Sequence, residues 1–264
     1  MTNDQLFDLC HHVQHVARET GAYIREQRKT LSASQIESKG KNNFVTVVDK
    51  AAEEMLVLQL GRLFPEAGFI TEEDATRIRH AEWNWIIDPL DGTSNFIHGV
   101  PCYCVSIALA KNNEPVLGVI YEINLDECFY AVKDFGSYLN GKSVYCSAAT
   151  RLDESLVATG FPYDIGEQKE MYLNLFSSVL ENSRGIRRMG SAAVDMAYVA
   201  CGRFDAFYEK GLNSWDIAAG TIIVQEAGGA VSDFKGGDDF LFGKTLICGT
   251  PAVVSEIVKI TAAV

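Results

Sequence analysis

The sequence predicts a mixed α and β protein, and two patterns along the chain favour this fold class. Between residues 102 and 132, apolar β-prone runs separated by short turns are typical of an antiparallel meander. Beyond residue 150, strand-like runs alternate with helix-like segments. No linker or repeat separates the two patterns. We therefore expect one domain over residues 1–264, with halves of roughly 1–145 and 146–264.

The first part of the chain predicts two helices. An amphipathic helix is expected over residues 4–29, because apolar side chains recur there at helical spacing. His11 and His15 lie one turn apart on this helix, where we expect a solvated face and not a metal site. The polar segment 38–43 is expected to be a loop, followed by a second helix over 50–63.

Other elements follow from short apolar runs and turn residues. Strands are expected at 69–71, 85–87, 102–110, 116–121, 127–132, 156–159, 186–188, 203–209 and 246–248. Helices are expected at 169–180, 190–199, 214–226 and 252–260. Asn140-Gly141 predicts a hairpin turn, whereas 75–82 is polar and irregular.

Composition limits the partners and the compartment. The chain has 264 residues, 47% of them hydrophobic, and a net charge of −12, so it lacks the basic surface that nucleic acid requires. An anionic substrate would need bound cations to reverse the local sign. Seven scattered cysteines predict a reduced, cytoplasmic chain. The polar N-terminus and the lack of a long apolar run predict no signal peptide and no membrane partner.

A stretch from residue 85 to residue 96 carries the chemistry. Residues 85–87 are apolar and read as a buried strand, and Pro89 is expected to end it because proline lacks a backbone donor. Asp91 and Gly92 predict a tight turn. The side chains of residues 93–95 are expected to cap a short helix. The backbone amides at the start of that helix would then be free to bind a ligand.

Two carboxylates this close predict a cation site. Asp88 and Asp91 would repel each other unless a cation bridged them, and hard oxygen ligands suit Mg²⁺. Amides at a helix N-terminus suit a phosphate. The alternative is an ordinary acidic loop. Two other acidic segments weaken that alternative: the carboxylates at 72–74 follow a strand, and Asp216 begins a helix.

Four segments resemble the inositol monophosphatase family. Residues 88–93, DPLDGT, resemble its D-P-[ILF]-D-G-[TS] signature, and residues 215–229 resemble its second signature, W-D-x-A-A-G followed by E-A-G-G. Residues 70–73 and 44–49 resemble two shorter segments, F-I-G-E-E and D-x-V-T-x-x-D. The segments occur in the order of the family. The resemblance implies a five-layered α-β-α-β-α sandwich of the inositol monophosphatase and fructose-1,6-bisphosphatase type, with the site between its halves.

The resemblance also implies site residues and cofactors. Two or three Mg²⁺ ions would be held by Glu72, Asp88, the Leu90 carbonyl, Asp91 and Asp216. Glu72 and Thr93 would orient the attacking water and accept its proton, in an in-line displacement that two metal ions stabilise. The implied substrate-binding residues are Leu90, Asp91, Gly92, Thr93, Gly190, Ser191, Ala192, Glu209 and Asp216.

The leading hypothesis is a Mg²⁺-dependent, lithium-sensitive phosphatase that hydrolyses inositol 1-phosphate, a small phosphate monoester, and acts as a homodimer. A sister enzyme for histidinol phosphate, fructose 1,6-bisphosphate or a 3′-phosphonucleotide is the first alternative. A regulatory or scaffold protein that keeps the fold is the second, although a scaffold has no need of mutually repelling acids.

Several polar residues have more than one possible role. Asp49 is either a helix-start carboxylate or, by the resemblance, a residue that orients water near Glu72. Lys39 would neutralise charge. Arg187-Arg188 would face either substrate or a second subunit. Asp195 is expected to cap its helix or to make an internal hydrogen bond.

Overall fold

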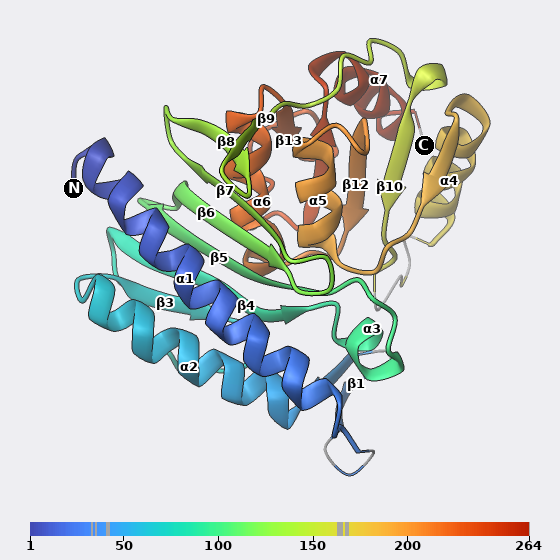
Figure 1. The fold of residues 1–264 in the computed structure, drawn as a ribbon. Coiled ribbons are helices and arrows are strands. Elements are labelled where there is room, and N and C mark those ends of the chain that lie inside the picture. The colour runs from blue at the N-terminus through green and yellow to red at the C-terminus, as the bar shows by residue number, and fades with distance from the viewer. Residues whose placement is uncertain (33, 35, 41–42, 163–165, 167–168, 264) are drawn as a thin grey trace.

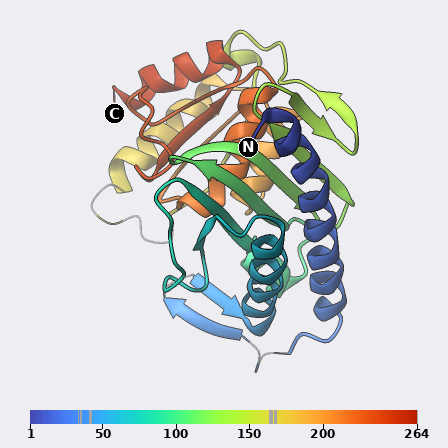
Figure 2. The same cartoon turned by 90° about the vertical axis from the view of Figure 1, so that its left-hand side faces the viewer.

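A computed structural model describes residues 1–32, 34, 36–40, 43–162, 166 and 169–263. It confirms the mixed α and β class and shows five layers (Figures 1 and 2). Helices α1 and α2 cover the outer face of a seven-stranded sheet, and α5 and α6 lie between this sheet and a five-stranded one. Helices α4 and α7 cover the far face of the smaller sheet.

Several helices begin at polar residues that satisfy their first backbone amides. The helices are α1 (Asn3–Arg28), α2 (Val47–Leu63), α3 (Thr93–His98), α4 (Lys169–Asn182), α5 (Ala192–Ala200), α6 (Ser214–Glu226) and α7 (Pro251–Thr261), with a 3₁₀ turn η2 (Leu152–Glu154). Thr2, Thr46 and Asn213 form capping boxes, each with the residue three positions on. The predicted helices all form.

The larger sheet contains the predicted meander. Its order is β3-β4-β5-β6-β7-β8-β9, and only β3 and β4 pair in parallel. The strands are β3 (Gly68–Thr71), β4 (Trp83–Asp91), β5 (Cys104–Lys111), β6 (Glu114–Glu122), β7 (Glu127–Val132), β8 (Gly136–Leu139) and β9 (Lys142–Val144). The predicted turn at Asn140-Gly141 joins the last two strands.

The smaller sheet has the order β11-β10-β12-β14-β13 and mixes parallel and antiparallel pairs. Its strands are β10 (Leu156–Thr159), β11 (Gly185–Arg187), β12 (Ala206–Lys210), β13 (Ala230–Ser232) and β14 (Thr245–Gly249). The three-residue strand β13 was not predicted, because it is too short for a periodic signal. Strand β12 begins later than expected, because Arg203 still bonds back to the end of α5 through the carbonyl of Tyr198.

The expected loop at residues 38–43 is partly wrong. Strands β1 (Ile36–Gly40) and β2 (Asn43–Thr46) form a separate antiparallel hairpin. A strand does not need apolar side chains when its backbone pairs at the surface, which explains why a polar segment gave no signal. The side chain of Lys39 lies outside the described residues, and so do residues 41 and 42.

The prediction that Pro89 ends its strand is wrong. Strand β4 continues to Asp91, where Asp88 pairs with Ser106 and Asp91 with Cys104. Three steps on one strand therefore match two on the other, which is a β-bulge. Proline is tolerated at a bulge, because no ladder hydrogen bond is required of it there. The bulge lies between the two carboxylates, so Asp88 belongs to the last regular pair before it and Asp91 to the pair after it.

The short helix after this strand forms, but side chains do not cap it as expected. Its N-cap is Gly92, with φ of 96° and no side-chain hydrogen bond. Glycine is favoured in this left-handed conformation because it has no Cβ. The hydroxyl of Thr93 is therefore available for other contacts.

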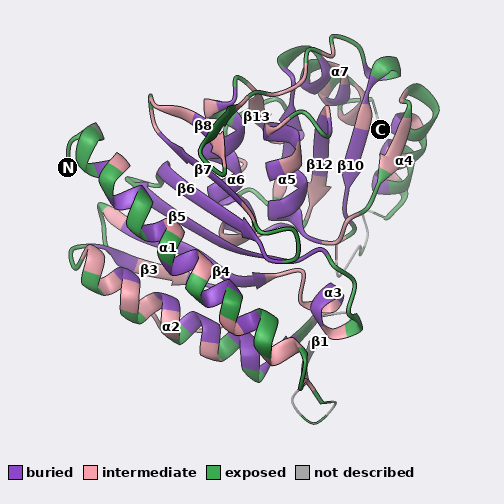
Figure 3. Ribbon diagram, viewed as in Figure 1, coloured by how far each residue is buried: buried purple, intermediate pink, exposed green. Residues whose placement is uncertain are grey.

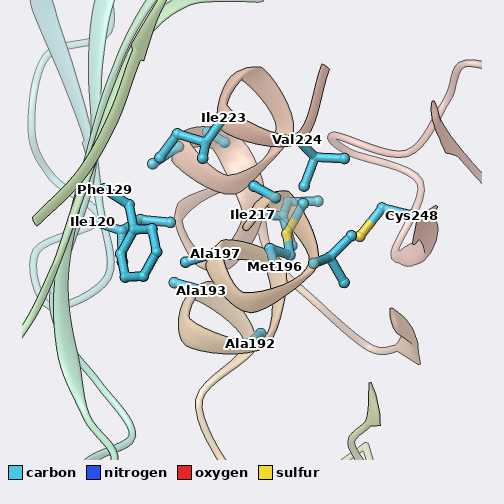
Figure 4. Packing of buried hydrophobic residues seen from close by; sticks show 14 of the residues in the cluster. Ile120, Phe129, Ala192, Ala193, Met196, Ala197, Ile217, Ile223, Val224 and Cys248 are labelled. Atoms are coloured by element: carbon cyan, nitrogen blue, oxygen red, sulfur yellow. The ribbon is translucent and has the colours of Figure 1, made fainter. Parts of the chain in front are cut away.

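Small residues allow the middle layer to pack tightly. Helices α5 and α6 are buried on nearly every side, as the purple ribbon in Figure 3 shows. Gly118 on β6 lies against the backbone of Ala219, where a Cβ would come within 2.7 Å of the Ala219 carbonyl. Figure 4 shows Ile120 and Phe129 of the larger sheet facing Ala193 and Ala197 of α5. This packing fixes the N-terminal ends of α5 and α6 beside the end of β4.

Candidate active site

A cavity of about 220 Å³ lies where β4, β12 and the first turns of α5 and α6 meet. All of the predicted site residues line it: Glu72, Asp88, Leu90, Asp91, Gly92, Thr93, Gly190, Ser191, Ala192, Glu209 and Asp216. The lining also includes Gly160, Arg188, Asp195 and Lys210, which were not predicted as site residues.

Asp88 is the most buried carboxylate of the predicted metal ligands, with 2% of its surface exposed. Its Oδ1 accepts a hydrogen bond of 3.0 Å from the amide of Leu90. Burial raises the pKa of Asp88 well above its ordinary value, and the nearby charges of Glu72, Asp91 and Asp216 raise it further. A charged Asp88 therefore needs a cation close by.

Asp91 links strand β4 to helix α5. Its Oδ2 accepts hydrogen bonds from the hydroxyl of Ser191, at 2.6 Å, and from the amide of Ala193, at 2.8 Å. The hydroxyl of Ser191 also caps α5 through the amide of Val194. Burial raises the pKa of Asp91, although these hydrogen bonds oppose the shift. Ser191 thus positions a carboxylate in this structure.

Asp216 lies in the first turn of α6. Its Oδ2 accepts a hydrogen bond of 2.6 Å from the amide of Asn213, which completes the capping box. Burial raises the pKa of Asp216 to about 8, and the charge of Asp91 adds to the shift. Helix α6 thereby holds its carboxylate in the same acidic pocket.

These residues fit Mg²⁺ by donor type and charge. Within the described residues, no three His, Cys, Asp or Glu side chains already converge on one ion position. Asp88, Asp91 and Asp216 each give one oxygen to a local donor, which leaves the other oxygen for a ligand. Hard oxygen donors that repel one another are suited to a small divalent cation. Glu72, Asp88, Asp91, Asp216 and the carbonyl of Leu90 would hold it.

Thr93 makes a contact that the sequence did not reveal. Its hydroxyl lies 3.0 Å from Oδ1 of Asp49 and 3.0 Å from the carbonyl of Leu90. Asp49 is buried, with 1% of its surface exposed, and it also completes the capping box of α2. The capping motif around Asp49 is visible in the sequence, but its contact with Thr93 is not.

The segment after β3 is attached to helix α2. Oε2 of Glu53 accepts a hydrogen bond of 2.8 Å from the amide of Glu73, the residue next to Glu72. Oε1 of Glu53 lies 3.9 Å from Nε of Arg77. A buried glutamate thus fixes the backbone beside a predicted metal ligand.

Glu209 lies at the end of β12 and fits closely over Gly160. A Cβ added to Gly160 would overlap the carboxylate of Glu209. Burial raises the pKa of Glu209 to about 8, with a contribution from Asp91, whereas Arg188 opposes the shift. Glu209 can therefore occupy this position only because Gly160 has no side chain.

Asp195 does not take the role expected for it. The N-cap of α5 is Ser191, and in the described part of the chain no hydrogen bond reaches Oδ1 of Asp195. Arg188 lines the cavity and lies near enough to affect both Asp195 and Glu209. Because no donor of its own helix reaches Oδ1 of Asp195, the sequence around Asp195 gave no local signal of this arrangement.

An acidic cavity between the two sheets of a five-layered sandwich is the arrangement of a known class of phosphatases. The sequence model of the inositol monophosphatase family matches residues 8–262, so the chain belongs to this family. Members of the family are generally Mg²⁺-dependent.

Relatives of known name cover almost the whole chain. Nus factor SuhB of Escherichia coli K12 is 40% identical over 242 residues, which are 91% of each chain. Inositol monophosphatase of Dictyostelium discoideum is 39% identical over 251 residues, covering 93% of this chain and 92% of that one.

Solved structures agree with the fold. Extragenic suppressor protein suhB from Bartonella henselae superimposes with a TM-score of 0.89 at 37% identity, covering 94% of this chain and 95% of that one. Inositol monophosphatase from Anabaena superimposes with a TM-score of 0.87 at 32% identity, covering 100% of this chain and 98% of that one.

Among the described residues, no helix has the length and apolar character that crossing a bilayer requires.

Proposed function

We propose that this protein hydrolyses a small phosphate monoester, inositol 1-phosphate in the first place, to the alcohol and phosphate with the help of two or three Mg²⁺ ions. The observation that carries the proposal is the gathering of Glu72, Asp88, Asp91 and Asp216 around one cavity. Such a group of acids is unfavourable unless cations offset it.

Thr93 and Asp49 are proposed to position the attacking water. Because Asp49 accepts the hydroxyl proton of Thr93, the oxygen of Thr93 can accept a hydrogen bond from that water. Glu72 is proposed to take up the proton. When bound, Mg²⁺ supplies the positive charge that offsets the acids and the phosphate. The amides of Gly92 and Thr93 are proposed to bind phosphate oxygens.

The leaving alcohol would lie on the opposite wall. Glu209 is proposed to accept hydrogen bonds from its hydroxyl groups, with the backbone at Gly190–Ala192 beside it. A polyol such as inositol presents several such hydroxyls. Histidinol phosphate, fructose 1,6-bisphosphate or a 3′-phosphonucleotide would meet the same phosphate-binding residues and differ on this wall.

A phosphate-release assay tests the function. The substrates are inositol 1-phosphate, the three alternatives and an aryl phosphate, ranked by kcat/KM with and without Mg²⁺. We expect hydrolysis that depends on Mg²⁺, is inhibited by Li⁺ and favours inositol 1-phosphate. Full activity in excess chelator would overturn the metal-dependent mechanism, and a different leading substrate would overturn the specificity.

A regulatory function is the second candidate, because a relative at 40% identity bears the name Nus factor. It predicts that phosphate release stays at background for every substrate. Loss of all hydrolysis in Asp91→Asn, measured against an active wild type, would instead support the enzyme.

We further propose a single phosphatase domain with halves at 1–145 and 146–264, acting as a cytoplasmic homodimer that binds neither nucleic acid nor membranes. The net charge of −12 supports the lack of a nucleic-acid partner. Light scattering on the purified chain tests the dimer, and an RNA gel shift at low salt tests the absence of nucleic-acid binding.

A further inference from the structure

Asp195 is a buried acid that the mechanism above does not use. Only 1% of its surface is exposed, and it is the sole charged residue of helix α5. Its neighbours along the helix are apolar and pack into the core between the two sheets, as Figure 4 shows for Ala193, Met196 and Ala197. Nothing in the packing of α5 calls for a carboxylate at this position.

One oxygen of this carboxylate also lacks a hydrogen-bond partner among the described residues. Across the described residues, Oδ1 of Asp195 has no hydrogen-bond donor. An unpaired polar group in a protein interior is unfavourable, and a carboxylate is more so. Buried polar groups of this kind are rare and call for a bound water or ligand as their partner.

The surroundings identify the side from which a partner would come. Asp195 lines the active-site cavity together with Glu209, Arg188 and Gly190. Glu209 and Asp91 are the acids near enough to affect it, and Arg188 is the nearby cation. The carboxylate therefore lies at the part of the cavity where the leaving alcohol is proposed to bind, beside Glu209 and Arg188.

We propose that Asp195 is a specificity-determining residue that accepts a hydrogen bond from a hydroxyl group of the leaving alcohol. Together with Glu209 it forms a pair of acceptors for different hydroxyls of one polyol. The inference rests on the proposed function, because it assigns a group to the alcohol of that same reaction. A carboxylate left without a donor until substrate arrives gives selectivity, since an alcohol without the hydroxyl cannot satisfy it.

Kinetics on three substrates test the assignment: inositol 1-phosphate, an aryl phosphate and a deoxyinositol phosphate. Asp195→Ala is expected to lower kcat/KM for inositol 1-phosphate roughly 10- to 150-fold, the loss typical of a hydrogen bond to a charged acceptor. Hydrolysis of an aryl phosphate should change little. Among deoxyinositol phosphates, the one that lacks the hydroxyl contacted by Asp195 should be hydrolysed by wild type with a lower kcat/KM than inositol 1-phosphate. On that substrate, Asp195→Ala should lower kcat/KM no further. Asp195→Asn, which keeps an acceptor oxygen, should fall between wild type and Asp195→Ala.

Thermal unfolding separates this role from a structural one. Replacement of an unpartnered carboxylate by its neutral isostere in Asp195→Asn should leave the melting temperature unchanged or raise it. Thr221→Val is the matched control, because Thr221 on α6 is buried, its hydroxyl has no partner among the described residues, and it lies outside the cavity lining. Like Asp195→Asn, Thr221→Val should leave the melting temperature unchanged or raise it. Unlike Asp195→Asn, it should keep wild-type kinetics on inositol 1-phosphate and on the aryl phosphate.

Three results would overturn the inference. Equal losses of activity on both substrates, with a lower melting temperature in Asp195→Asn, would make Asp195 a support of the fold. Unchanged kinetics in both variants would mean that an ordered water satisfies the carboxylate. A wild type that hydrolyses the aryl phosphate but no polyol phosphate would overturn the proposed substrate, and this inference with it.

Discussion

The hydroxyl of Thr93 and the carboxylate of Asp49 are joined by a hydrogen bond of 3.0 Å, although 44 residues separate them in the chain. The other oxygen of Asp49 accepts hydrogen bonds from the amide and hydroxyl of Thr46, at 2.9 and 2.6 Å. Asp49 therefore connects the start of α2 to the turn that follows β4. The same side chain caps a helix and holds a hydroxyl at the proposed reaction centre.

Removal of this acceptor should slow the reaction more than it weakens substrate binding. In Asp49→Ala, the hydroxyl of Thr93 would be left with the Leu90 carbonyl as its acceptor and would no longer be held for the water. We expect kcat to fall about 10²-fold or more, the range of general acid–base contributions, while KM changes little. Thr93→Ala should give a similar result. Steady-state kinetics at saturating Mg²⁺ measure both constants.

Thr46→Ala is the control for the capping role of Asp49. It removes the Thr46 hydroxyl from the capping box and should destabilise the fold by about 1 kcal/mol, yet it keeps the acceptor of Thr93. Urea unfolding measures that loss. If Thr46→Ala slowed kcat as much as Asp49→Ala, the effect would belong to helix α2 and not to the hydroxyl.

The sequence predicted those features that depend on neighbouring residues. The meander followed from alternating apolar runs and turn residues, and the acidic turn followed from Asp88 and Asp91 lying three residues apart. Contacts between distant segments gave no local signal, and the hydrogen bond between Thr93 and Asp49 is one of these. The family resemblance named Glu209 but could not show that Gly160 makes room for it.

The errors have physical causes. Pro89 lies at a bulge, where the ladder needs no donor, so the usual effect of proline on a strand is absent. Asp195 was expected to cap its helix or to make an internal hydrogen bond, because the side chains of polar residues in helices commonly bond to nearby backbone groups. Its burial follows from the position of α5 between two sheets, which becomes visible only once the layers are assembled.

Stability of the metal-free protein should decrease as the pH rises. The pKa values of Glu209 and Asp216 are raised to about 8, whereas the unfolded chain has the ordinary values 4.5 and 3.8. Between about pH 4 and pH 8, these two groups therefore bind more protons in the folded state than in the unfolded state. Their stabilising contribution is therefore complete below about pH 4 and is lost as the pH passes through 8. Each group contributes a slope of at most about 1.4 kcal/mol per pH unit.

Urea unfolding in excess chelator from pH 5 to pH 9 measures this slope. Asp216→Asn removes one titrating group and should flatten the curve. Saturating Mg²⁺ should also flatten it, because the ion favours the charged carboxylates and stabilises the folded state. A metal-free protein that becomes more stable between pH 5 and pH 8 would contradict the assignment of raised pKa values.

Gly160→Ala should reproduce the effect of removing Glu209. The new Cβ would overlap the carboxylate of Glu209, whose flexible side chain would move away. We expect both Gly160→Ala and Glu209→Ala to lower kcat/KM for inositol 1-phosphate, by about 1.5–3 kcal/mol or roughly 10- to 150-fold for the latter. Activity on an aryl phosphate should change little. Gly61→Ala is the control, because its Cβ would meet only the Phe69 ring at 3.7 Å. Equal losses on both substrates would mean that Glu209 supports the site as a whole.

Glu53→Ala should raise the Mg²⁺ concentration that the protein needs. Glu53 holds the amide of Glu73 at 2.8 Å, and its loss would release the backbone next to Glu72. Loss of this hydrogen bond to a charged acceptor should also reduce stability by about 1–3 kcal/mol. Glu54→Ala is the matched control, because Glu54 is the next residue of α2, is exposed and pairs with Arg77 at the surface. We expect several-fold weaker Mg²⁺ binding by Glu53→Ala alone, measured by calorimetry and by the rise in melting temperature with added Mg²⁺. Identical Mg²⁺ titrations for the two variants would show that the contact between Glu53 and Glu73 does not position the predicted ligand Glu72.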